Sequence, residues 1–189
     1  VGVDVNPGML EVARRVEPAI DWRQGDAGSL PLVDGERVCV TNFNRQLHAL
    51  ESSIGRPKAE VMAERLRLIN PNLHVEPIAE HYGEQNAERL LPAGAGTSFV
   101  IDAIDTVKAK LHLLARCVRE RLPVVSAMGA AGRLDPTAVQ VSDLCESHTD
   151  QFAKDVRKYL RRNYGIDCTV PTGILAVWSR ERARLPLAL

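Results

Sequence analysis

The stretch "VDGERVCVTNFNRQLHAL", residues 33–50, decides how the rest of the sequence is interpreted. A short apolar run at 38–40 stops abruptly and gives way to a polar segment. Ligands of open α/β sheets bind beyond the carboxyl ends of the strands. We therefore interpret 38–40 as a short buried strand and the polar segment as a candidate binding loop. Its five hydrogen-bonding side chains are Thr41, Asn42, Asn44, Arg45 and Gln46.

The composition is that of one ordinary domain of 189 residues with a single apolar core. Acidic and basic residues balance, so net charge alone points to no polyanionic or membrane partner. Neither a signal peptide nor a membrane span is expected, because no stretch approaches the roughly 18 apolar residues that a spanning helix needs. The four cysteines form no C-x-x-C pair, which argues against structural zinc and favours a reducing, cytoplasmic location.

Short apolar runs alternate with helical patterns along the chain, which is typical of an α/β sheet with crossover helices. The run at 98–105 has a continuous apolar core and predicts a strand buried on both faces. The full set of expected elements is strands over 1–5, 20–27, 73–79, 98–105, 123–128, 138–144 and 173–178, and helices over 7–16, 58–69, 111–122 and 150–164.

Further polar residues follow other predicted strands. Asp102 and Asp105 come at the end of the 98–105 run, and Ser126 follows the next apolar run. Lys58 begins a helix, where the backbone dipole already favours an anion. Together, Arg45 and Lys58 would neutralise a polyphosphate while Asp105 holds a bridging magnesium ion. Such a set suits attack on a nucleoside triphosphate, whose transition state needs positioning and charge neutralisation.

Each of these residues also has an ordinary interpretation. Arg45 and Lys58 are equally compatible with surface charges, and either aspartate with a helix cap. Only their order and spacing as a set favours a site. His48 is expected to be a satisfied polar residue, since that is the commoner role of a lone histidine. Cys39 and Cys117 are expected in the core.

The order of motifs resembles a known family. Residues 34–75 show an acidic strand end, then T-N-x-N-R-Q, then G-x-x-K-A, then a helix ending in N-P. This pattern is similar to that of the ATP-dependent activating enzymes related to ThiF, MoeB and the ubiquitin-activating enzymes. The segments "VIDAIDTVKAK", "GAAGRLDPT", "VQVSDL" and "GIDC" resemble their tRNA threonylcarbamoyladenosine dehydratase (TcdA/CsdL-like) branch. The resemblance covers about 34–178 and implies a Rossmann-like, doubly wound, mostly parallel sheet.

The resemblance implies an adenylating enzyme. ATP and Mg²⁺ would be used to activate a carboxylate, and in this branch the reaction cyclises N6-threonylcarbamoyladenosine in tRNA with net loss of water. Arg45, Lys58 and Asp105 would be catalytic, and Asp105 would also bind the metal. A homodimer is implied, and a sulfur-acceptor-type partner protein is compatible with the family. The implied nucleotide-binding positions are Asp34, Thr41, Asn42, Asn44, Arg45, Lys58, Asp105 and Thr106.

Two observations favour the dehydratase branch over the sulfur-transfer branch. The zinc-binding C-x-x-C pairs of the latter are absent, and the helix expected at 150–164 carries five basic residues against one acid between 151 and 164. That helix is compatible with a tRNA backbone contact, and equally with a solvated basic face. The roles of Cys145 and Cys168 stay open.

The first 33 residues show a different pattern. The family's G-x-G-G-x-G loop does not occur in them, so the fold is expected to be truncated at that loop and its activity impaired. "VGVDVNPGML" and "RQGDAGSLPL" instead resemble a class I S-adenosylmethionine-dependent methyltransferase, whose cofactor acids would be Asp4 and Asp26. The expected division is a methyltransferase-like fragment at 1–33, an adenylating domain at 34–180 and a frayed tail at 181–189.

Two alternatives to the adenylating function stay open. The first is a catalytically inactive remnant that binds protein or RNA, which the missing glycine loop favours. The second, ranked lowest, is a methyltransferase.

Overall fold

The computed structural model describes residues 2–4, 11, 15, 22–24, 29–94, 97 and 99–184. The chain forms two compact units, Val1–His81 and Tyr82–Leu189, which are described separately. The two units are defined by contacts within the structure. The expected division into 1–33, 34–180 and 181–189 is based on sequence resemblance instead, and it stays a prediction. The helix expected at 7–16 lies largely outside the described residues. No helix in the described part of the chain is long and apolar enough to cross a membrane.

The first unit contains two pairs of parallel strands. β1 (Gly2–Asp4) pairs with β2 (Trp22–Gln24), and β3 (Ser29–Val33) pairs with β4 (His74–Ile78). Helix α2 (Lys58–Ile69) connects β3 to β4 and packs against both, as a parallel crossover requires. Two short 3₁₀ turns, η1 (Val40–Asn42) and η2 (Glu51–Ser53), lie in the long loop between β3 and α2.

Helix α2 begins where the sequence predicts and approaches the strands closely through small side chains. Ala59 and Ala63, one turn apart, are buried, and so is Val75 of β4, the strand that α2 contacts. The burial of apolar residues does not continue to the end of the helix, because Ile69 is 69% exposed. The helix ends at Ile69, because Pro71 restricts the preceding Asn70 to an extended conformation.

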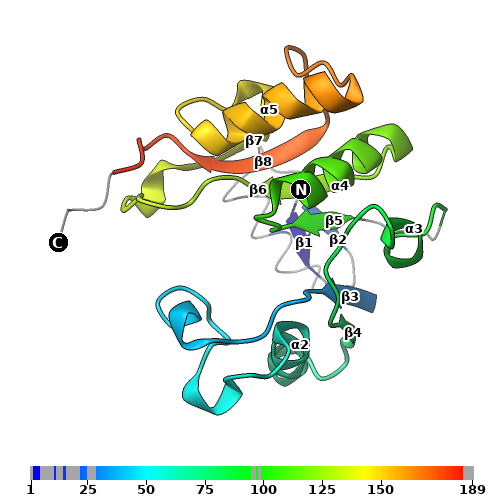
Figure 1. Cartoon of the computed structure of the whole chain (residues 1–189), viewed down its shortest axis with the longest axis vertical. Helices are drawn as coiled ribbons and strands as arrows, with labels where there is room; N and C mark the ends of the chain where they lie inside the picture. The colour runs from blue at the N-terminus through cyan, green and yellow to red at the C-terminus, as the bar shows by residue number, and fades with distance from the viewer. Residues whose placement is uncertain are drawn as a thin grey trace. The chain divides into compact units, whose positions relative to one another are not determined.

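The second unit is a four-stranded sheet in the order β5-β6-β8-β7 (Figure 1). β5 (Val100–Asp102), β6 (Val124–Ala127) and β8 (Ile174–Ser179) run parallel, and β7 (Val139–Asp143) runs antiparallel to β8. The remaining elements are α3 (Ala87–Leu90), α4 (Val107–Glu120), α5 (Gln151–Tyr164), η3 (Pro136–Ala138) and η4 (Leu144–Glu146).

The core of this unit lies between the sheet and the helices α4 and α5. Alternate strand residues such as Val124, Ile174 and Ala176 are buried there with Leu114 and Leu160 of the two helices. Residues of opposite parity are more exposed. The prediction that 98–105 is buried on both faces is therefore wrong: the strand covers only Val100–Asp102, and Ile101 is 74% exposed.

A buried ion pair joins α4 to this sheet. Asp102 of β5 lies directly opposite Ser126 of β6, and the Ser126 hydroxyl donates to Asp102 Oδ2 at 2.6 Å. Lys110 Nζ of α4 donates to the same carboxylate oxygen at 2.6 Å and lies 3.1 Å from Ser126 Oγ. All three residues are almost fully buried. Burial lowers the pKa of Lys110, and attraction to Asp102 opposes that shift.

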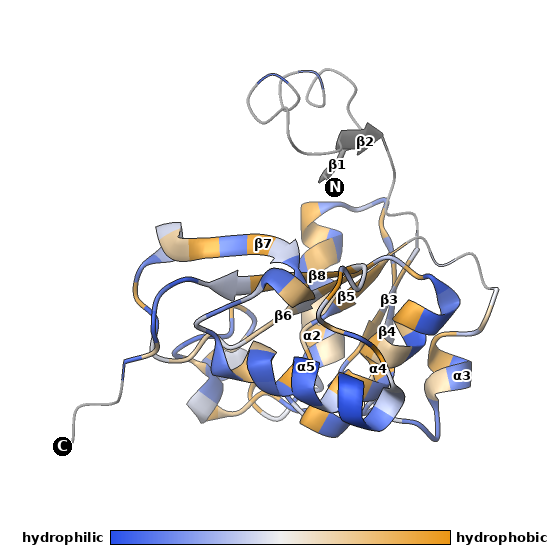
Figure 2. Ribbon diagram, turned by 90° about the horizontal axis from the view of Figure 1, so that it is seen from above, coloured by the Kyte–Doolittle hydropathy of each residue, from blue (hydrophilic) through white to orange (hydrophobic). Residues whose placement is uncertain are grey.

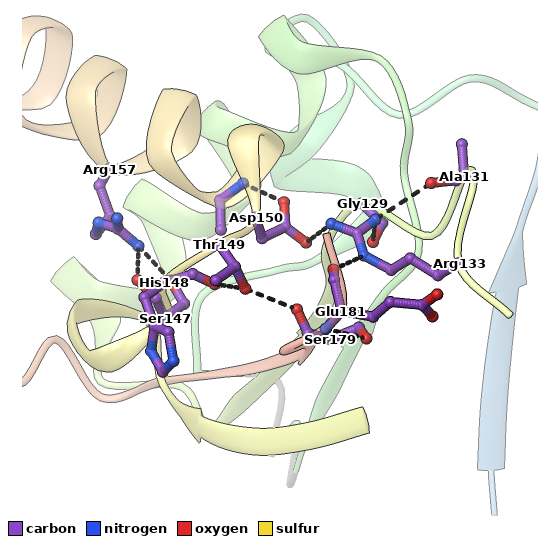
Figure 3. Close-up of polar contacts among 11 residues, drawn as sticks. Gly129, Ala131, Arg133, Ser147, His148, Thr149, Asp150, Arg157, Ser179 and Glu181 are labelled. Atoms are coloured by element: carbon purple, nitrogen blue, oxygen red, sulfur yellow. Dashed lines mark hydrogen bonds and ion pairs between the residues drawn. The ribbon is translucent and has the colours of Figure 1, made fainter. Parts of the chain in front are cut away.

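A second polar cluster holds the start of α5 (Figure 3). Asp150 caps α5 by accepting a hydrogen bond from Ala153 N at 2.9 Å, and its other carboxylate oxygen lies 3.2 Å from Arg133 Nη2. Thr149 adopts a positive φ of 61°, and its hydroxyl donates to the backbone carbonyls of His148 and Ser179. This cluster joins the 129–133 loop to the end of β8 and to the first turn of α5, which begins where the sequence predicts.

Removing the cation of the buried pair should be costly. In Lys110→Ala the Asp102 carboxylate stays buried without its charge partner, so we expect a loss of about 3–5 kcal/mol in the free energy of unfolding. Urea denaturation followed by circular dichroism measures this loss. The matched control is Lys108→Ala on the exposed face of the same helix, which should change stability by less than about 0.5 kcal/mol. Equal losses in the two variants would contradict the assignment.

Asp143, at the end of β7, predicts a pH dependence. Burial raises its pKa, but backbone N–H groups of Cys145, Thr172 and Gly173 outweigh burial and hold the pKa below its ordinary value of 3.8. This stabilisation is therefore present above the unfolded-state pKa and is lost as pH falls through the lower folded-state pKa. Asp143→Asn should cost about 1–3 kcal/mol at pH 7. Its unfolding free energy should fall less steeply than that of wild type between pH 5 and pH 2; parallel curves would refute the role.

Candidate functional site

The candidate site in the first unit is the loop that follows β3. Asp34 comes directly after the last residue of that strand, and its N–H donates to the carbonyl of Ile78 at 3.1 Å. Its side chain accepts from Glu36 N at 2.8 Å, which turns the chain away from the strand. An acid at the end of a strand is the arrangement implied for Asp34. The sequence reasoning missed β3 itself, because Pro31 interrupts its pattern and prolines are uncommon within strands.

The strand expected at 38–40 does not form, so that prediction is wrong. Val38 exchanges backbone hydrogen bonds of 2.9 Å with Gly55 and Arg56, which belong to a loop and not to a strand. Val38 is buried, but Val40 is 63% exposed and begins the 3₁₀ turn η1. In such a short apolar run, burial of a single residue is enough to hold the segment in place. The run can therefore form a turn as readily as a strand.

The structure brings Thr41, Asn44 and Arg45 together. Arg45 Nη1 donates to the carbonyl oxygen of Thr41 at 2.9 Å and to Asn44 Oδ1 at 3.0 Å, while the residue itself stays exposed. Asn42 has a different role, since it is buried and its Oδ1 accepts from Cys39 N at 3.1 Å. Asn42 thus shapes the turn that presents the guanidinium of Arg45 to solvent.

Lys58 is not an ordinary surface lysine. It is the first residue of α2 and only 3% exposed, and its Nζ forms an ion pair with Glu36, whose side chain is 54% exposed. The hydrogen bond from Lys58, helped by attraction to Lys58 and Arg45, holds the pKa of Glu36 below its usual value of 4.5. Glu36 was not predicted as a site residue; the only available signal was a second acid two positions after Asp34.

His48 is not the satisfied polar residue that the sequence predicts. Neither of its ring nitrogens has a hydrogen-bond partner within the described part of the chain, and the same holds for Gln46 Oε1. Burial lowers the pKa of His48; Lys58 lowers it further, while Asp34 opposes the shift. The loop therefore contains unused donors and acceptors beside an acid and a lysine. A polar, anionic ligand such as ATP fits this set of groups.

The other two predicted site residues belong to the second unit, between β5 and α4. Asp105 is exposed, and its Oδ1 accepts from the Thr106 hydroxyl at 3.4 Å. Neither aspartate caps α4, because the cap position is Thr106; the helix-cap alternative is wrong for both Asp102 and Asp105. Asp102 is the acidic partner in the buried ion pair with Lys110. Asp105 is left with an available carboxylate, and one carboxylate together with phosphate oxygens suffices for Mg²⁺.

The cysteines differ in environment. Cys117 is buried as predicted, but Cys39 is exposed, so its expected place in the core is wrong. Cys39 Sγ lies 2.8 Å from the Thr41 hydroxyl; this contact and the nearby Lys58 lower the pKa of the thiol below 9.0. Burial raises the pKa of Cys117 to about 11, and desolvation together with Asp143 raises that of Cys145 to about 11. Within the described residues, no group of three or more His, Cys, Asp or Glu side chains is placed to hold a metal ion.

A parallel strand is followed by an acid, then by a loop that presents Arg45, and then by a helix that begins with Lys58. This is the arrangement that the resemblance to ATP-dependent activating enzymes implies. Residues 24–176 match the ThiF family, and the chain belongs to this family. The match begins before residue 33, inside the segment that resembles a methyltransferase; no methyltransferase is among the relatives described here, and that resemblance has no support from them.

Two similar proteins are bacterial tRNA threonylcarbamoyladenosine dehydratases. The chain is 43% identical over 161 residues to the tRNA threonylcarbamoyladenosine dehydratase of Escherichia coli, covering 84% of this chain and 59% of that protein. It is 40% identical over 154 residues to the Bacillus subtilis enzyme of the same name, covering 82% and 58%. The chain thus spans a little under three fifths of the length of these relatives.

The fold agrees with that of a solved relative. The crystal structure of E. coli tRNA N6-threonylcarbamoyladenosine dehydratase, TcdA, in complex with ATP matches with a TM-score of 0.79 at 36% identity. The match covers 97% of this chain and 73% of that one. The predicted α/β, Rossmann-like fold is therefore confirmed, as is the resemblance to the ThiF-type activating enzymes.

The environment of Cys39 predicts selective reactivity. Because the thiolate is the reactive form, Cys39 should react with a thiol reagent such as DTNB at pH 7.5 at least several-fold faster than Cys145 or Cys117. Thr41→Val should slow the fast phase by removing the hydrogen bond to the sulfur, and Cys39→Ser should abolish it. A fast phase that survives in Cys39→Ser would show that another thiol is responsible.

Proposed function

We propose that this chain binds ATP and uses it to adenylate a carboxylate. The observation that carries the proposal is the loop after β3, where an exposed Arg45 lies on Thr41 and Asn44 and a buried Lys58 holds Glu36. Two cations for a polyphosphate and a strand-end acid, Asp34, for ribose hydroxyls occur within one segment of 25 residues, 34–58. The ATP bound by the E. coli relative supports the same ligand.

The proposed roles follow from the local geometry of each residue. Within the described residues, Arg45 uses only Nη1 for its hydrogen bonds to Thr41 and Asn44, which orient it. Its other guanidinium N–H groups bind phosphate oxygens directly. Asn42 acts by holding the turn. Lys58 is paired with a half-exposed Glu36, so a phosphate oxygen can replace that partner without leaving the ammonium unpaired. In the second unit, Asp105 is proposed to bind Mg²⁺, with Thr106 beside it.

The proposed substrate is the threonyl carboxylate of N6-threonylcarbamoyladenosine in tRNA. A carboxylate oxygen attacks the α-phosphorus of ATP, and pyrophosphate leaves. Attack within the modified nucleoside on the activated acyl carbon then closes a ring and releases AMP, so that water is lost overall. Arg45 and Lys58 neutralise the charge that develops on the leaving pyrophosphate.

The proposed setting and assembly rest on the family and on composition. We propose that the protein is a homodimer in the cytoplasm and that its macromolecular partner is tRNA. The similarity to tRNA threonylcarbamoyladenosine dehydratases supports tRNA as the partner. A sulfur-acceptor-type partner protein is a further proposal that follows from the wider family alone.

The Arg45→Ala variant tests the function. Pyrophosphate release should be measured with ATP, Mg²⁺ and tRNA carrying N6-threonylcarbamoyladenosine. Loss of one preorganised charged donor should lower the rate by about 10²–10³-fold. The control is Arg65→Ala, which removes an exposed arginine from α2 and should leave the rate unchanged. Bound ATP should also slow the labelling of Cys39 in wild type but not in Arg45→Ala.

The alternative of an inactive binding module makes the opposite prediction. It requires equal pyrophosphate release, at background level, from wild type and Arg45→Ala. Calorimetry showing no ATP binding together with an unprotected Cys39 would favour it and would refute the proposed function.

A further inference from the structure

Helix α5 carries an unusual concentration of positive charge. It contains five basic residues and one acid, although the chain as a whole is neutral. The acid, Asp155, already accepts from Gln151 Nε2 at 3.2 Å. One of the cations is also engaged, because Arg157 donates to the carbonyl of Ser147 at 2.7 Å and to that of Leu144 at 3.2 Å. The four remaining cations are exposed: Lys154, Lys158, Arg161 and Arg162.

These four side chains lie on one face of the helix. Their spacing of i, i+4, i+7 and i+8 places them opposite the buried Ala153, Val156 and Leu160. The face extends about 12 Å along the axis at about 1.5 Å per residue. Within the described residues, none of the four forms an ion pair. Figure 2 shows α5 as a mainly hydrophilic helix along the side turned to the viewer.

The basic face borders a hollow formed with the segment after the helix. The hollow has a volume of about 570 Å³ and is lined by Arg157, Lys158, Arg161, Arg162, Cys168 and Thr169. The nearby Asp167 does not fill it, because its carboxylate accepts from the backbone N and the hydroxyl of Thr169 at 2.9 and 2.7 Å. These bonds, with a smaller contribution from Arg161, hold the pKa of Asp167 below 3.8.

The chemistry of this surface suits repeated phosphates. It offers several guanidinium and ammonium groups in a row beside a concave surface, with few apolar side chains. Arginine donors match phosphate oxygens in a planar, two-point geometry, and successive helical turns present cations at regular intervals to a phosphodiester chain. An ordinary solvated face would mix both signs of charge, and here Asp155 alone opposes five cations within the helix.

We propose that the exposed basic face of α5, with its hollow, binds the tRNA substrate through its phosphate backbone. This inference rests on the proposed function, which supplies tRNA as the substrate, and it locates where the nucleic acid is held. Binding at this face is independent of base sequence, so it positions the RNA and leaves recognition of the modified nucleoside to other groups.

The test measures binding of an unmodified tRNA transcript in the absence of ATP, by fluorescence anisotropy over a series of salt concentrations. Lys158→Ala/Arg162→Ala should raise Kd at least tenfold at low salt. It should also lower the slope of log K against log salt by about 1.5, since each lost phosphate contact contributes about 0.7–0.9. The control Arg65→Ala/Arg182→Ala removes two exposed charges elsewhere and should change Kd less than twofold.

Several outcomes would overturn the inference. One is an equal loss of affinity in both double variants, which would indicate a response to net charge. Another is an unchanged Kd in the α5 variant. Poly-glutamate that binds as tightly as tRNA and depends on the same two residues would assign the face to an acidic protein instead. Circular dichroism and urea unfolding of each variant exclude misfolding as the cause.

Failure of this inference is separable from failure of the proposed function. ATP binding is measured by calorimetry without RNA, and the α5 variant should bind ATP as wild type does. A wild type that binds tRNA through α5 but not ATP would refute the proposed function alone. A wild type that binds ATP and tRNA with no dependence on Lys158 and Arg162 would refute this inference alone.

Discussion

The second unit depends on the buried contact among Asp102, Lys110 and Ser126. Desolvating a carboxylate and an ammonium costs several kcal/mol for each ion, and this cost is offset only when geometry and hydrogen bonds are good. Here one carboxylate oxygen accepts from both the ammonium and the hydroxyl, and Asp102 Oδ1 accepts from Ile104 N at 2.9 Å. Few other arrangements of β5, β6 and α4 would satisfy these groups, so the pair fixes how they pack. That register also sets where Asp105 and Thr106 emerge between β5 and α4.

The first unit uses a lysine and an acid in a different way. Lys58 is nearly as buried as Lys110, but its partner Glu36 is half-exposed. An acid that can be solvated when it is displaced makes a suitable temporary partner for a lysine that must later hold an anion. Asp102 has no such freedom, since it is enclosed on all sides. The contrast explains why one ion pair supports the fold and the other suits a binding loop.

Much of the fold could be predicted from local pattern, because α2, α4, α5 and β4 each show a clear periodicity or a terminating proline. The loop at 41–46 could be predicted for the same reason: its polar residues are adjacent in sequence. What could not be predicted depends on partners distant in the chain. Nothing local indicates that Lys58 pairs with Glu36, that Lys110 is buried against Asp102, or that Asn42 supports a turn while Arg45 faces solvent. The wrong prediction of a strand at 38–40 has the same cause. The backbone partners of the buried Val38 are distant in the chain, and without them a buried valine in a loop cannot be distinguished from one in a strand.

Because β7 runs antiparallel to β8, the chain leaves one strand and enters the other at the same end of the sheet. Helix α5 and the segment 165–173 therefore form a connection that begins and ends at that same end of the sheet. Asp143 fastens its two ends by accepting from Thr172 and Gly173 beside the start of β8. A connection whose two ends are held together in this way can change in length or composition without altering the order of the strands. Only the buried side of α5, which includes Val156 and Leu160, is needed to cover the sheet. Related chains could therefore acquire different macromolecular targets by changing the exposed face of α5 and leaving its buried side unchanged.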